Sequence, residues 1–142
     1  MKEKISKETE TSFSVIMTKE KGEGLVCSRL LRRHEFVCDY PGLLIGREEG
    51  ENFAKQHPEA SPYLFFFTEK GLDLCVDGSA KTGLGNLINH SRLQPNIEPK
   101  VGVVNNRPHV FFVVIASEIQ AFQELLYDYG DHRKDVPWLS QS

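Results

Sequence analysis

LGNLINHS, at residues 84–91, is the most unusual segment of this chain. An apolar run that ends directly in Asn89-His90-Ser91 places strong hydrogen-bonding side chains at the rim of a hydrophobic core. Taken alone, the simplest explanation is a core histidine whose hydrogen bonds are satisfied, next to an asparagine in a turn. The stretch becomes informative only together with two others, one on each side of it in the chain.

KGEGL, at residues 21–25, precedes this stretch, and ELLYDYG, at residues 124–130, follows it. Glycines in the first would let the backbone approach a ligand closely, although a β-turn alone is the more ordinary explanation. In the second, Tyr127 and Tyr129 would point to the same side of an extended strand. An aromatic pair at a strand end is the ordinary alternative there. The order and spacing of the three stretches therefore carry more information than any one of them.

The length and composition are those of one globular domain. A chain of 142 residues can bury enough surface to fold without a disulfide or a metal. Hydrophobic residues make up 39% and charged residues 26%, which excludes a collagen-like, coiled-coil or wholly disordered chain. The net charge of −3 argues against binding bare nucleic acid through net charge alone, and it suits a basic partner.

Many short β-prone runs and no sustained helical periodicity predict an α+β fold that is mostly β. The clearest signals are two hairpins, one at residues 63–76 with a turn at 68–71 and one at 101–115 with a turn at 105–108. Residues 47–57 suggest one or two helical turns. Further short strands are predicted at residues 13–17, 25–28 and 36–40.

Cysteine use and apolar runs indicate the compartment. Cys27, Cys38 and Cys75 are an odd number at wide spacings, so we expect reduced thiols packed as small apolar groups, with no zinc site and no disulfide framework. The polar N-terminal residues lack the apolar segment of a secretory signal, and the longest apolar run, 110–116, is too short to cross a bilayer. We expect a reduced intracellular protein without membrane association.

Common catalytic motifs give no alternative. There is no Walker A loop and no HExxH, and Gly83-Leu84-Gly85 lacks the third glycine and the βαβ context of a dinucleotide site. His90-Ser91 lies outside any G-x-S-x-G segment, so a serine hydrolase is not indicated.

In order and spacing, the glycine turn, the Asn-His-Ser segment and ELLYDYG together resemble the SET domain of protein-lysine methyltransferases. FVCDYPG at residues 36–42 and ASEI at 116–119 resemble further segments of that family, and the likeness extends from Gly22 to Trp138. It implies a SET fold of several small sheets of short strands with a C-terminal pseudoknot-like threading. The regions implied are a polar N-terminal tail (1–12), the SET domain (13–130) and a short C-terminal tail that packs on the cofactor site (131–142).

Within the family, the chain is most similar to the branch that monomethylates lysine twenty of the fourth core histone. YLFFF at 63–67, LLYDYGD at 125–131 and PWL at 137–139 carry this likeness, and the absence of cysteine clusters separates the chain from zinc-bearing branches. The resemblance implies a nuclear histone-lysine N-methyltransferase that acts on a histone tail or nucleosome. The alternative is a diverged, weakly active or inactive SET module that binds the cofactor or chromatin proteins.

The resemblance also implies a site for S-adenosyl-L-methionine and no metal. Backbone groups of Asn89 and His90 would contact the adenine, and the glycine turn would lie near the methionine end. Trp138 would stack on the adenine, with a plain anchor on the core as the alternative. The cofactor-binding candidates are Lys21, Gly22, Glu23, Gly24, Tyr63, Asn89, His90 and Trp138.

Tyr40, Tyr127 and Tyr129 would build the channel for the substrate lysine. The nearby sulfonium and the desolvated channel both lower the pKa of the lysine amine, so no strong base is required. Tyrosine hydroxyls would aim the amine lone pair at the methyl group, with Tyr129 as the main catalytic residue. Tyr127 occupies the family's Phe/Tyr switch position, where a hydroxyl would hold a water and restrict the product to monomethyl-lysine.

Four residues depart from the family pattern. Glu23 and Asn86 stand where this branch has arginine, which removes two cations from beside the cofactor carboxylate. His34 and Phe122 stand where turn glycines are expected, so both predict left-handed backbone occupied by a bulky residue.

Arg29, Arg32 and Arg33 are candidates for a weak contact with nucleosomal DNA. A solvated surface patch is the alternative for these arginines. We expect the protein to be a monomer.

Overall fold

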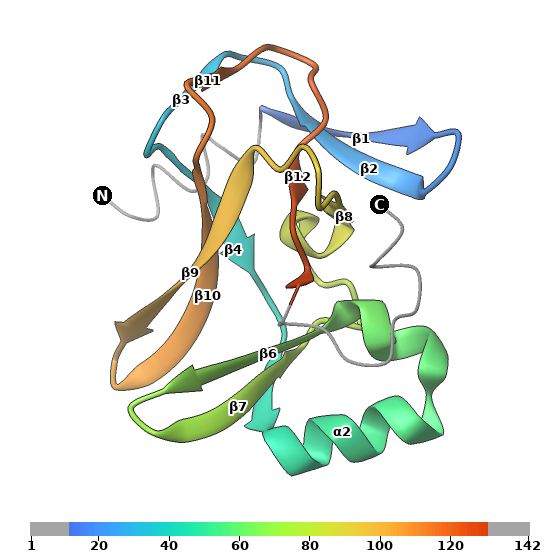
Figure 1. The fold of residues 1–142 in the computed structure, drawn as a ribbon, viewed down its shortest axis with the longest axis vertical. Coiled ribbons are helices and arrows are strands. Elements are labelled where there is room, and N and C mark those ends of the chain that lie inside the picture. Colours follow the sequence, from blue (N-terminus) through green and yellow to red (C-terminus); the bar gives the residue numbers. More distant parts are fainter. Residues whose placement is uncertain (1–11, 131–142) are drawn as a thin grey trace.

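The computed structural model describes residues 12–130, which form five small sheets and one α-helix (Figure 1). The fold is mostly β, as predicted. The strands are β1 (Phe13–Thr18), β2 (Gly22–Cys27), β3 (Leu31–Arg32), β4 (Phe36–Tyr40), β5 (Leu43–Gly46), β6 (Leu64–Glu69), β7 (Leu72–Asp77), β8 (Asn89–His90), β9 (Ile97–Val104), β10 (Arg107–Val114), β11 (Glu118–Ile119) and β12 (Leu126–Tyr127). The helix is α2 (Arg47–Gln56), and 3-10 turns cover Pro58–Tyr63 and Leu84–Leu87.

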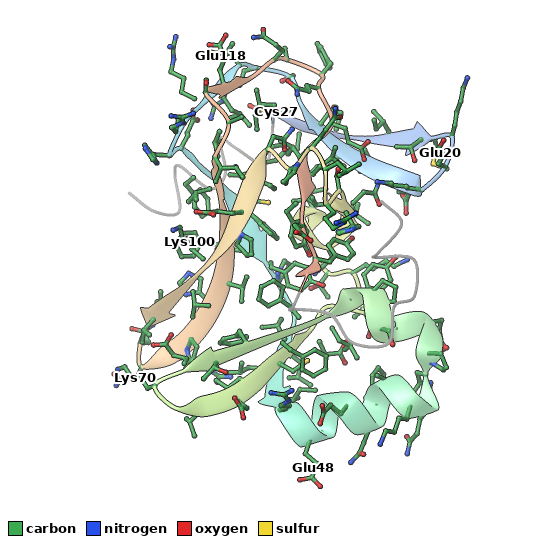
Figure 2. The ribbon with its side chains drawn as sticks, viewed as in Figure 1. Glu20, Cys27, Glu48, Lys70, Lys100 and Glu118 are labelled. Carbon is green, nitrogen blue, oxygen red and sulfur yellow. The ribbon has the colours of Figure 1, made fainter. Side chains whose placement is uncertain are left out.

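Two three-stranded antiparallel sheets, ordered β4-β10-β9 and β5-β7-β6, form most of the structure. Three smaller pairs complete it: β1-β2, β11-β3 and the parallel pair β12-β8. The hairpin tips lie at opposite ends of the molecule, with Glu20 at the tip of β1-β2 and Lys70 at the tip of β6-β7 (Figure 2).

Both predicted hairpins are present, but their turns are shorter than predicted. Lys70-Gly71 alone connects β6 to β7, and Asn105-Asn106 alone connects β9 to β10. Both asparagines have positive φ, 52° and 63°, as the two central residues of a type I′ turn require. Because two residues complete the turn, Pro108 lies inside β10, opposite Val103, and not in the turn as expected.

The helix α2 is ten residues long, longer than the one or two turns predicted. Its first turn carries Glu48 and Glu49 and its last turn Lys55, which match the helix dipole. Its weak periodicity follows from a narrow buried face made of Gly50 and Ala54. A side chain at Gly50 would come within 2.9 Å of the Cys75 sulfur, so glycine allows the helix to pack closely on β7.

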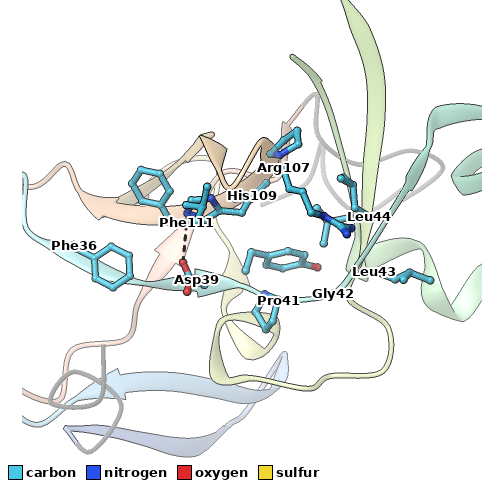
Figure 3. Close-up of a pocket in the computed structure, with 14 residues that line it drawn as sticks. Phe36, Asp39, Pro41, Gly42, Leu43, Leu44, Arg107, His109 and Phe111 are labelled. Carbon is cyan, nitrogen blue, oxygen red and sulfur yellow. Dashed lines mark ion pairs between the residues drawn. The ribbon is translucent and has the colours of Figure 1, made fainter. Parts of the chain in front are cut away.

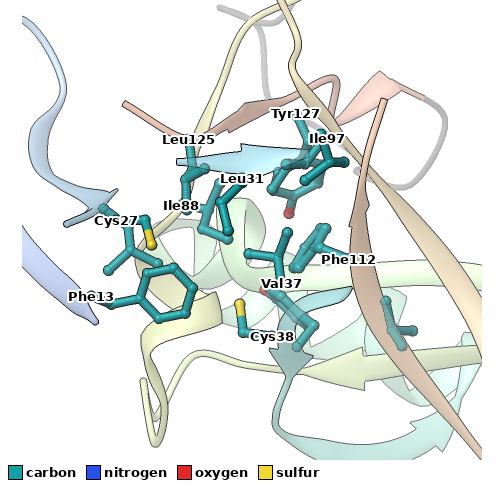
Figure 4. Packing of buried hydrophobic residues seen from close by; sticks show 14 of the residues in the cluster. Phe13, Cys27, Leu31, Val37, Cys38, Ile88, Ile97, Phe112, Leu125 and Tyr127 are labelled. Carbon is teal, nitrogen blue, oxygen red and sulfur yellow. The ribbon is translucent and has the colours of Figure 1, made fainter. Parts of the chain in front are cut away.

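The main core joins strands from most of the sheets around the fully buried rings of Phe65, Phe112 and Tyr127 (Figure 4). A second, smaller cluster lies under α2. All three cysteines are buried thiols that are not joined in disulfides, in agreement with the prediction.

The C-terminal part of the described chain runs between two strands that are distant in sequence. On one side β12 pairs in parallel with β8, Leu126 opposite Asn89 and Tyr127 opposite His90. On the other side the Leu125 N–H donates to the Leu25 carbonyl of β2, 2.9 Å away. This arrangement is the C-terminal threading that the SET resemblance implies. Of the helices in residues 12–130, none has the length and apolar character needed to span a bilayer.

Candidate functional site

The three stretches singled out in the sequence meet at one place in the structure. The glycine stretch forms β2, the Asn-His segment forms β8, and the Tyr127-Asp128-Tyr129 segment begins in β12. The parallel β12-β8 pairing and the bond from Leu125 to β2 hold all three together. Segments separated by up to a hundred residues of chain therefore form one wall.

A hydrogen bond between Asn89 and Glu124 stabilises the junction where β2, β8 and β12 meet. The Asn89 Nδ2 donates to Glu124 Oε2 at 2.8 Å and to the Glu23 carbonyl at 2.9 Å. A side chain at Gly24 would lie 2.5 Å from that Glu124 oxygen and 3.1 Å from Asn89 Nδ2. Gly24 is therefore required by the approach of these two side chains. Gly22 has a different reason, because its φ of 73° lies in the left-handed region of the hairpin turn.

His90 is buried, with 1% of its surface exposed, and its hydrogen bonding fixes its protonation. The Tyr129 backbone N–H donates to His90 Nδ1 at 2.9 Å, so this nitrogen is an acceptor without a proton and the ring is neutral. Asp128 Oδ1 lies 3.8 Å from the same nitrogen, but a neutral ring forms no ion pair with it. The histidine therefore positions Tyr129 by a neutral hydrogen bond.

Lys21 and Asn96 add two further ties. The Lys21 ammonium donates to the His90 carbonyl and connects the β1-β2 hairpin to β8. Asn96 is buried and uses both ends of its amide on the C-terminal segment: Nδ2 donates to the Glu124 carbonyl, and Oδ1 accepts from the Leu126 N–H, both at 2.9 Å. The junction is thus held by side-chain amides as well as by strand pairing.

A cavity of about 720 Å³ opens beside this junction. Its volume falls within the range of about 300–1,000 Å³ typical of small-molecule sites. Charged side chains of both signs and backbone of the Asn-His segment line it. Seven of the predicted site residues lie in its walls: Lys21, Gly22, Glu23, Tyr63, Asn89, His90 and Tyr129.

The three predicted channel tyrosines do not all face this cavity. Tyr129 lines it, and its hydroxyl donates to the Ile88 carbonyl at 2.7 Å. Tyr127 is fully buried, with its ring 4.7 Å from both the Tyr129 ring and the Phe112 ring. The Tyr40 ring also contacts Phe112, with 6.1 Å between the two ring centroids. The structure thus brings Tyr127 and Tyr129 into direct ring contact, and Phe112 contacts both Tyr127 and Tyr40.

Tyr63 connects Tyr40 to the cavity. The Tyr40 hydroxyl donates to the Tyr63 carbonyl at 2.6 Å, and the Gly78 N–H donates to the same oxygen at 2.9 Å. These two bonds fix the Tyr63 backbone where its side chain joins the cavity wall. Tyr40 therefore touches the site through the backbone of a lining residue.

Tyr40 itself lines a second cavity, also of about 720 Å³, between β4-β5 and the β9-β10 hairpin (Figure 3). Its walls are mainly aliphatic and aromatic. Asp39 and His109 provide a polar edge, with Asp39 Oδ1 4.0 Å from His109 Nε2. No sequence motif marks this cavity, because its walls are ordinary strand residues.

Three residues at this site were not assigned a role from the sequence. Glu124 belongs to a quoted motif, but only the fold shows that its carboxylate meets Asn89. Asn96 follows a proline in a polar segment and carries no local signal. Lys81 lines the cavity with its Nζ 4.8 Å from the centre of the Tyr63 ring. Trp138 lies outside the described residues.

The departures from the family pattern have clear structural correlates. His34 and Phe122 have φ of 72° and 65°, so the predicted left-handed backbone is confirmed at both. The amide of Asn86 is 3% exposed and bonded to the protein, with Nδ2 donating to the Pro41 carbonyl and Oδ1 accepting from the Gly83 N–H.

Within residues 12–130, no group of three or more His, Cys, Asp or Glu side chains is arranged to hold a metal ion.

Small sheets of short strands, with the end of the chain threaded between a glycine-rich hairpin and an Asn-His segment, define the SET class of fold. Residues 22–130 match the family described as SET domain, and the chain belongs to that family.

Similar proteins carry names from protein-lysine methylation. The Drosophila melanogaster protein named histone-lysine N-methyltransferase Set8 is 38% identical over 128 residues, which cover 84% of this chain and 18% of that protein. The crystal structure of CpSET8 from Cryptosporidium has a TM-score of 0.75 and 32% identity, covering 84% of this chain and 58% of that one.

A second similar structure holds the cofactor expected from the resemblance. Polycomb Repressive Complex 2 of Chaetomium thermophilum, in an autoinhibited conformation bound to S-adenosylmethionine, has a TM-score of 0.70 and 28% identity over 92% of this chain and 16% of that one. This chain spans only a minor part of the Drosophila and Chaetomium proteins. The activity in the Drosophila name and the ligand of the Chaetomium complex are properties of those proteins.

Proposed function

We propose that this protein is an S-adenosyl-L-methionine-dependent protein-lysine N-methyltransferase. The observation that carries the proposal is the convergence of β2, β8 and the Tyr127-Asp128-Tyr129 segment on one cavity. Membership of the SET family and the names of the similar proteins support it.

The residues of the cavity fit the cofactor. S-adenosylmethionine has a polar nucleoside, a sulfonium and a zwitterionic amino-acid end, and the walls offer backbone groups of Asn89 and His90, the aromatic ring of Tyr63 and charges of both signs. The adenine would lie against the Asn-His segment and the methionine end against the glycine hairpin. When bound, the cofactor supplies a methyl group activated by its sulfonium.

Reaction requires a neutral lysine amine whose lone pair faces the methyl carbon. The amine nitrogen forms its new bond as the carbon–sulfur bond breaks, and the proton leaves from the amine to solvent. A free lysine has a pKa near about 10.4, and a neighbouring sulfonium in a dry channel lowers it. The Tyr129 hydroxyl donates to the Ile88 carbonyl, and in the proposed role its oxygen would accept a hydrogen bond from this amine and orient it. Positioning of this kind can lower a barrier by several kcal/mol, so the site needs no dedicated base.

We propose that monomethyl-lysine is the main product. Tyr127 is fully buried between Phe112 and Tyr129, so its surroundings cannot easily widen to admit a methylated amine. Its hydroxyl would hold a water at the position where a second methyl group has to fit.

The proposed substrate is lysine twenty of the fourth core histone, in a histone tail or nucleosome, and the proposed location is nuclear chromatin. The likeness of YLFFF and LLYDYGD to that branch and the Set8 name of the Drosophila relative support this choice. The net charge of −3 favours a basic tail without selecting among tails.

A weak contact with nucleosomal DNA is proposed for Arg32 and Arg33. Arg29 is less suited, because its guanidinium lies 2.5 Å from the Glu35 carboxylate. Arg33 makes a hydrogen bond of 3.4 Å to the Ser117 hydroxyl, which leaves its charge uncompensated. Replacing Arg32 and Arg33 by Gln should weaken nucleosome binding and reduce its salt dependence.

The test is cofactor binding by calorimetry, followed by methyl transfer to recombinant nucleosomes in which each histone tail lysine is replaced in turn. We expect binding, transfer, and loss of transfer only when lysine twenty of the fourth core histone is replaced. Binding without transfer would favour a non-catalytic SET module. Transfer to free peptides or non-histone proteins alone would contradict the proposed substrate.

A further inference from the structure

Lys81 is held at the mouth of the cavity by a tight turn after β7. The Lys81 N–H donates to the Gly78 carbonyl at 3.0 Å, and Asp77 Oδ1 accepts from both the Ser79 N–H and the Ser79 hydroxyl. The Gly78 N–H is bonded in turn to the Tyr63 carbonyl. Lys81 has a φ of 53°, a left-handed conformation that is uncommon for a residue other than glycine.

After this turn, the Lys81 ammonium lies over the Tyr63 ring in the cavity wall. Its Nζ lies 4.8 Å from the centre of the Tyr63 ring, and both residues line the cavity. A cation over an aromatic face is attracted to it, which limits the directions the exposed lysine chain takes. The ammonium is therefore held near a fixed point without losing access to a ligand.

Other candidates for a cation at this site are committed elsewhere. Lys21 belongs to the glycine hairpin, but its ammonium already donates to the His90 carbonyl. Asn86 stands where the resembling branch has arginine, but its amide is hydrogen-bonded to the Pro41 carbonyl and the Gly83 N–H. Among the described residues that line the cavity, Lys81 is the cation whose Nζ makes no hydrogen bond to the protein.

We propose that Lys81 binds the carboxylate of the amino-acid end of the cofactor and so replaces the two arginines this chain lacks at Glu23 and Asn86. The proposal rests on the proposed function. Glu23 lines the same cavity, so the site offers an anion and a cation to the ammonium and carboxylate of one amino acid. Lys81 is a binding residue in this role.

The experiment compares two ligands on the full chain by calorimetry. S-adenosylhomocysteine carries the amino-acid end, and 5′-methylthioadenosine has the nucleoside and sulfur without it. Lys81→Ala should weaken binding of S-adenosylhomocysteine about tenfold, since a charge-assisted bond at a partly exposed site is lost. Binding of 5′-methylthioadenosine should be unchanged, and Lys81→Arg should restore the affinity for S-adenosylhomocysteine.

Lys70→Ala is the matched control, because Lys70 is also an exposed turn lysine with left-handed backbone, φ 51°, at the far end of the molecule (Figure 2). It should change neither affinity. Equal loss of both ligands in Lys81→Ala would show that Lys81 acts only by packing on Tyr63. No loss of either would also overturn the proposal. If the unaltered protein binds neither ligand, the proposed function itself fails.

Discussion

The two cavities of this protein have the same volume, about 720 Å³, but are built in opposite ways. The cofactor-site cavity has charged and amide walls contributed by three segments that are distant in sequence. The second cavity has apolar walls from β4, β5 and the β9-β10 hairpin, which pair with neighbours along the sheets. Directional side-chain hydrogen bonds stabilise the walls of the cofactor-site cavity, whereas hydrophobic packing stabilises the walls of the second cavity.

Because of this difference, the two cavities should tolerate substitutions unequally. An apolar wall tolerates changes of similar size, because packing is adaptable. A wall held by Asn89, Glu124 and Asn96 loses a directional bond at each substitution, and the partner group is left buried without its hydrogen bond. Substitutions at the two cavities and in nearby turns can test this contrast.

Tyrosines of the two cavities should respond unequally to removal of the hydroxyl. Tyr129→Phe loses the bond to the Ile88 carbonyl and the group proposed to orient the amine, and we expect turnover to fall about 100-fold. Tyr40→Phe loses the bond to the Tyr63 carbonyl, and we expect about a tenfold decrease. Single-turnover methylation of nucleosomes measures both, with cofactor affinity as a check on folding. Equal effects would remove the distinction.

Gly24→Ala should disturb the junction itself. The added methyl group would meet Glu124 Oε2 at 2.5 Å, so the bond between Glu124 and Asn89 must shift. We expect a loss of about 2 kcal/mol in the free energy of unfolding, typical of overpacking, together with weaker cofactor binding.

Gly46→Ala is the control for this substitution, because a side chain there meets nothing within 4 Å and its φ is −75°. Because Gly46 is the N-cap residue of α2, where alanine is less favourable than glycine, we expect a loss of at most about 1 kcal/mol in the unfolding free energy, followed by urea denaturation, and no change in cofactor binding. If Gly24→Ala behaves like Gly46→Ala, the close approach of Asn89 and Glu124 is not what glycine permits.

Tyr127→Phe should change the product more than the rate. Removing the hydroxyl would release the proposed water and make room for a methylated amine, so dimethyl-lysine should accumulate. Mass spectrometry of the histone tail measures the distribution. Only monomethyl-lysine in the variant would show that Tyr127 does not set the product.

Phe122→Gly should have the smallest effect, and in the opposite direction. Phe122 is 68% exposed and has a φ of 65°, so glycine relieves left-handed strain and gives up little burial. After the greater freedom of glycine in the unfolded chain is subtracted, we expect a gain of about 0.5–1 kcal/mol in the free energy of unfolding. Ala121→Gly, an exposed neighbour without positive φ, should lose stability. A loss in both variants would contradict the strain.

Much of the fold could be predicted from local sequence signals. The two hairpins followed from β-prone runs separated by turn residues, and the left-handed positions His34 and Phe122 followed from the family pattern. The turn lengths were wrong by two residues, because two left-handed asparagines complete a turn without the residues after them. Helix α2 was underestimated, because glycine and alanine make its buried face and give almost no periodic signal.

For the site, the sequence identified seven residues that line one cavity but not the bonds that hold them. Glu124 and Asn89 are far apart in the chain, and only the threading of β12 beside β8 brings their side chains to 2.8 Å. Tyr40 was grouped with Tyr127 and Tyr129, and the structure shows that Phe112 contacts both Tyr40 and Tyr127. The roles of these three tyrosines in a lysine channel stay predictions.

By itself, the sequence determined the strand content, the two hairpins and the SET family, because these depend on local propensity and on motifs read in order along the chain. The tertiary structure alone decided which polar groups meet: Asn89 with Glu124, His90 with the Tyr129 backbone, and Lys81 with Tyr63. Such meetings depend on the path of the chain through space, since hydrogen bonds and cation–π contacts act only over a few ångströms and no local pattern encodes a partner that lies far along the sequence.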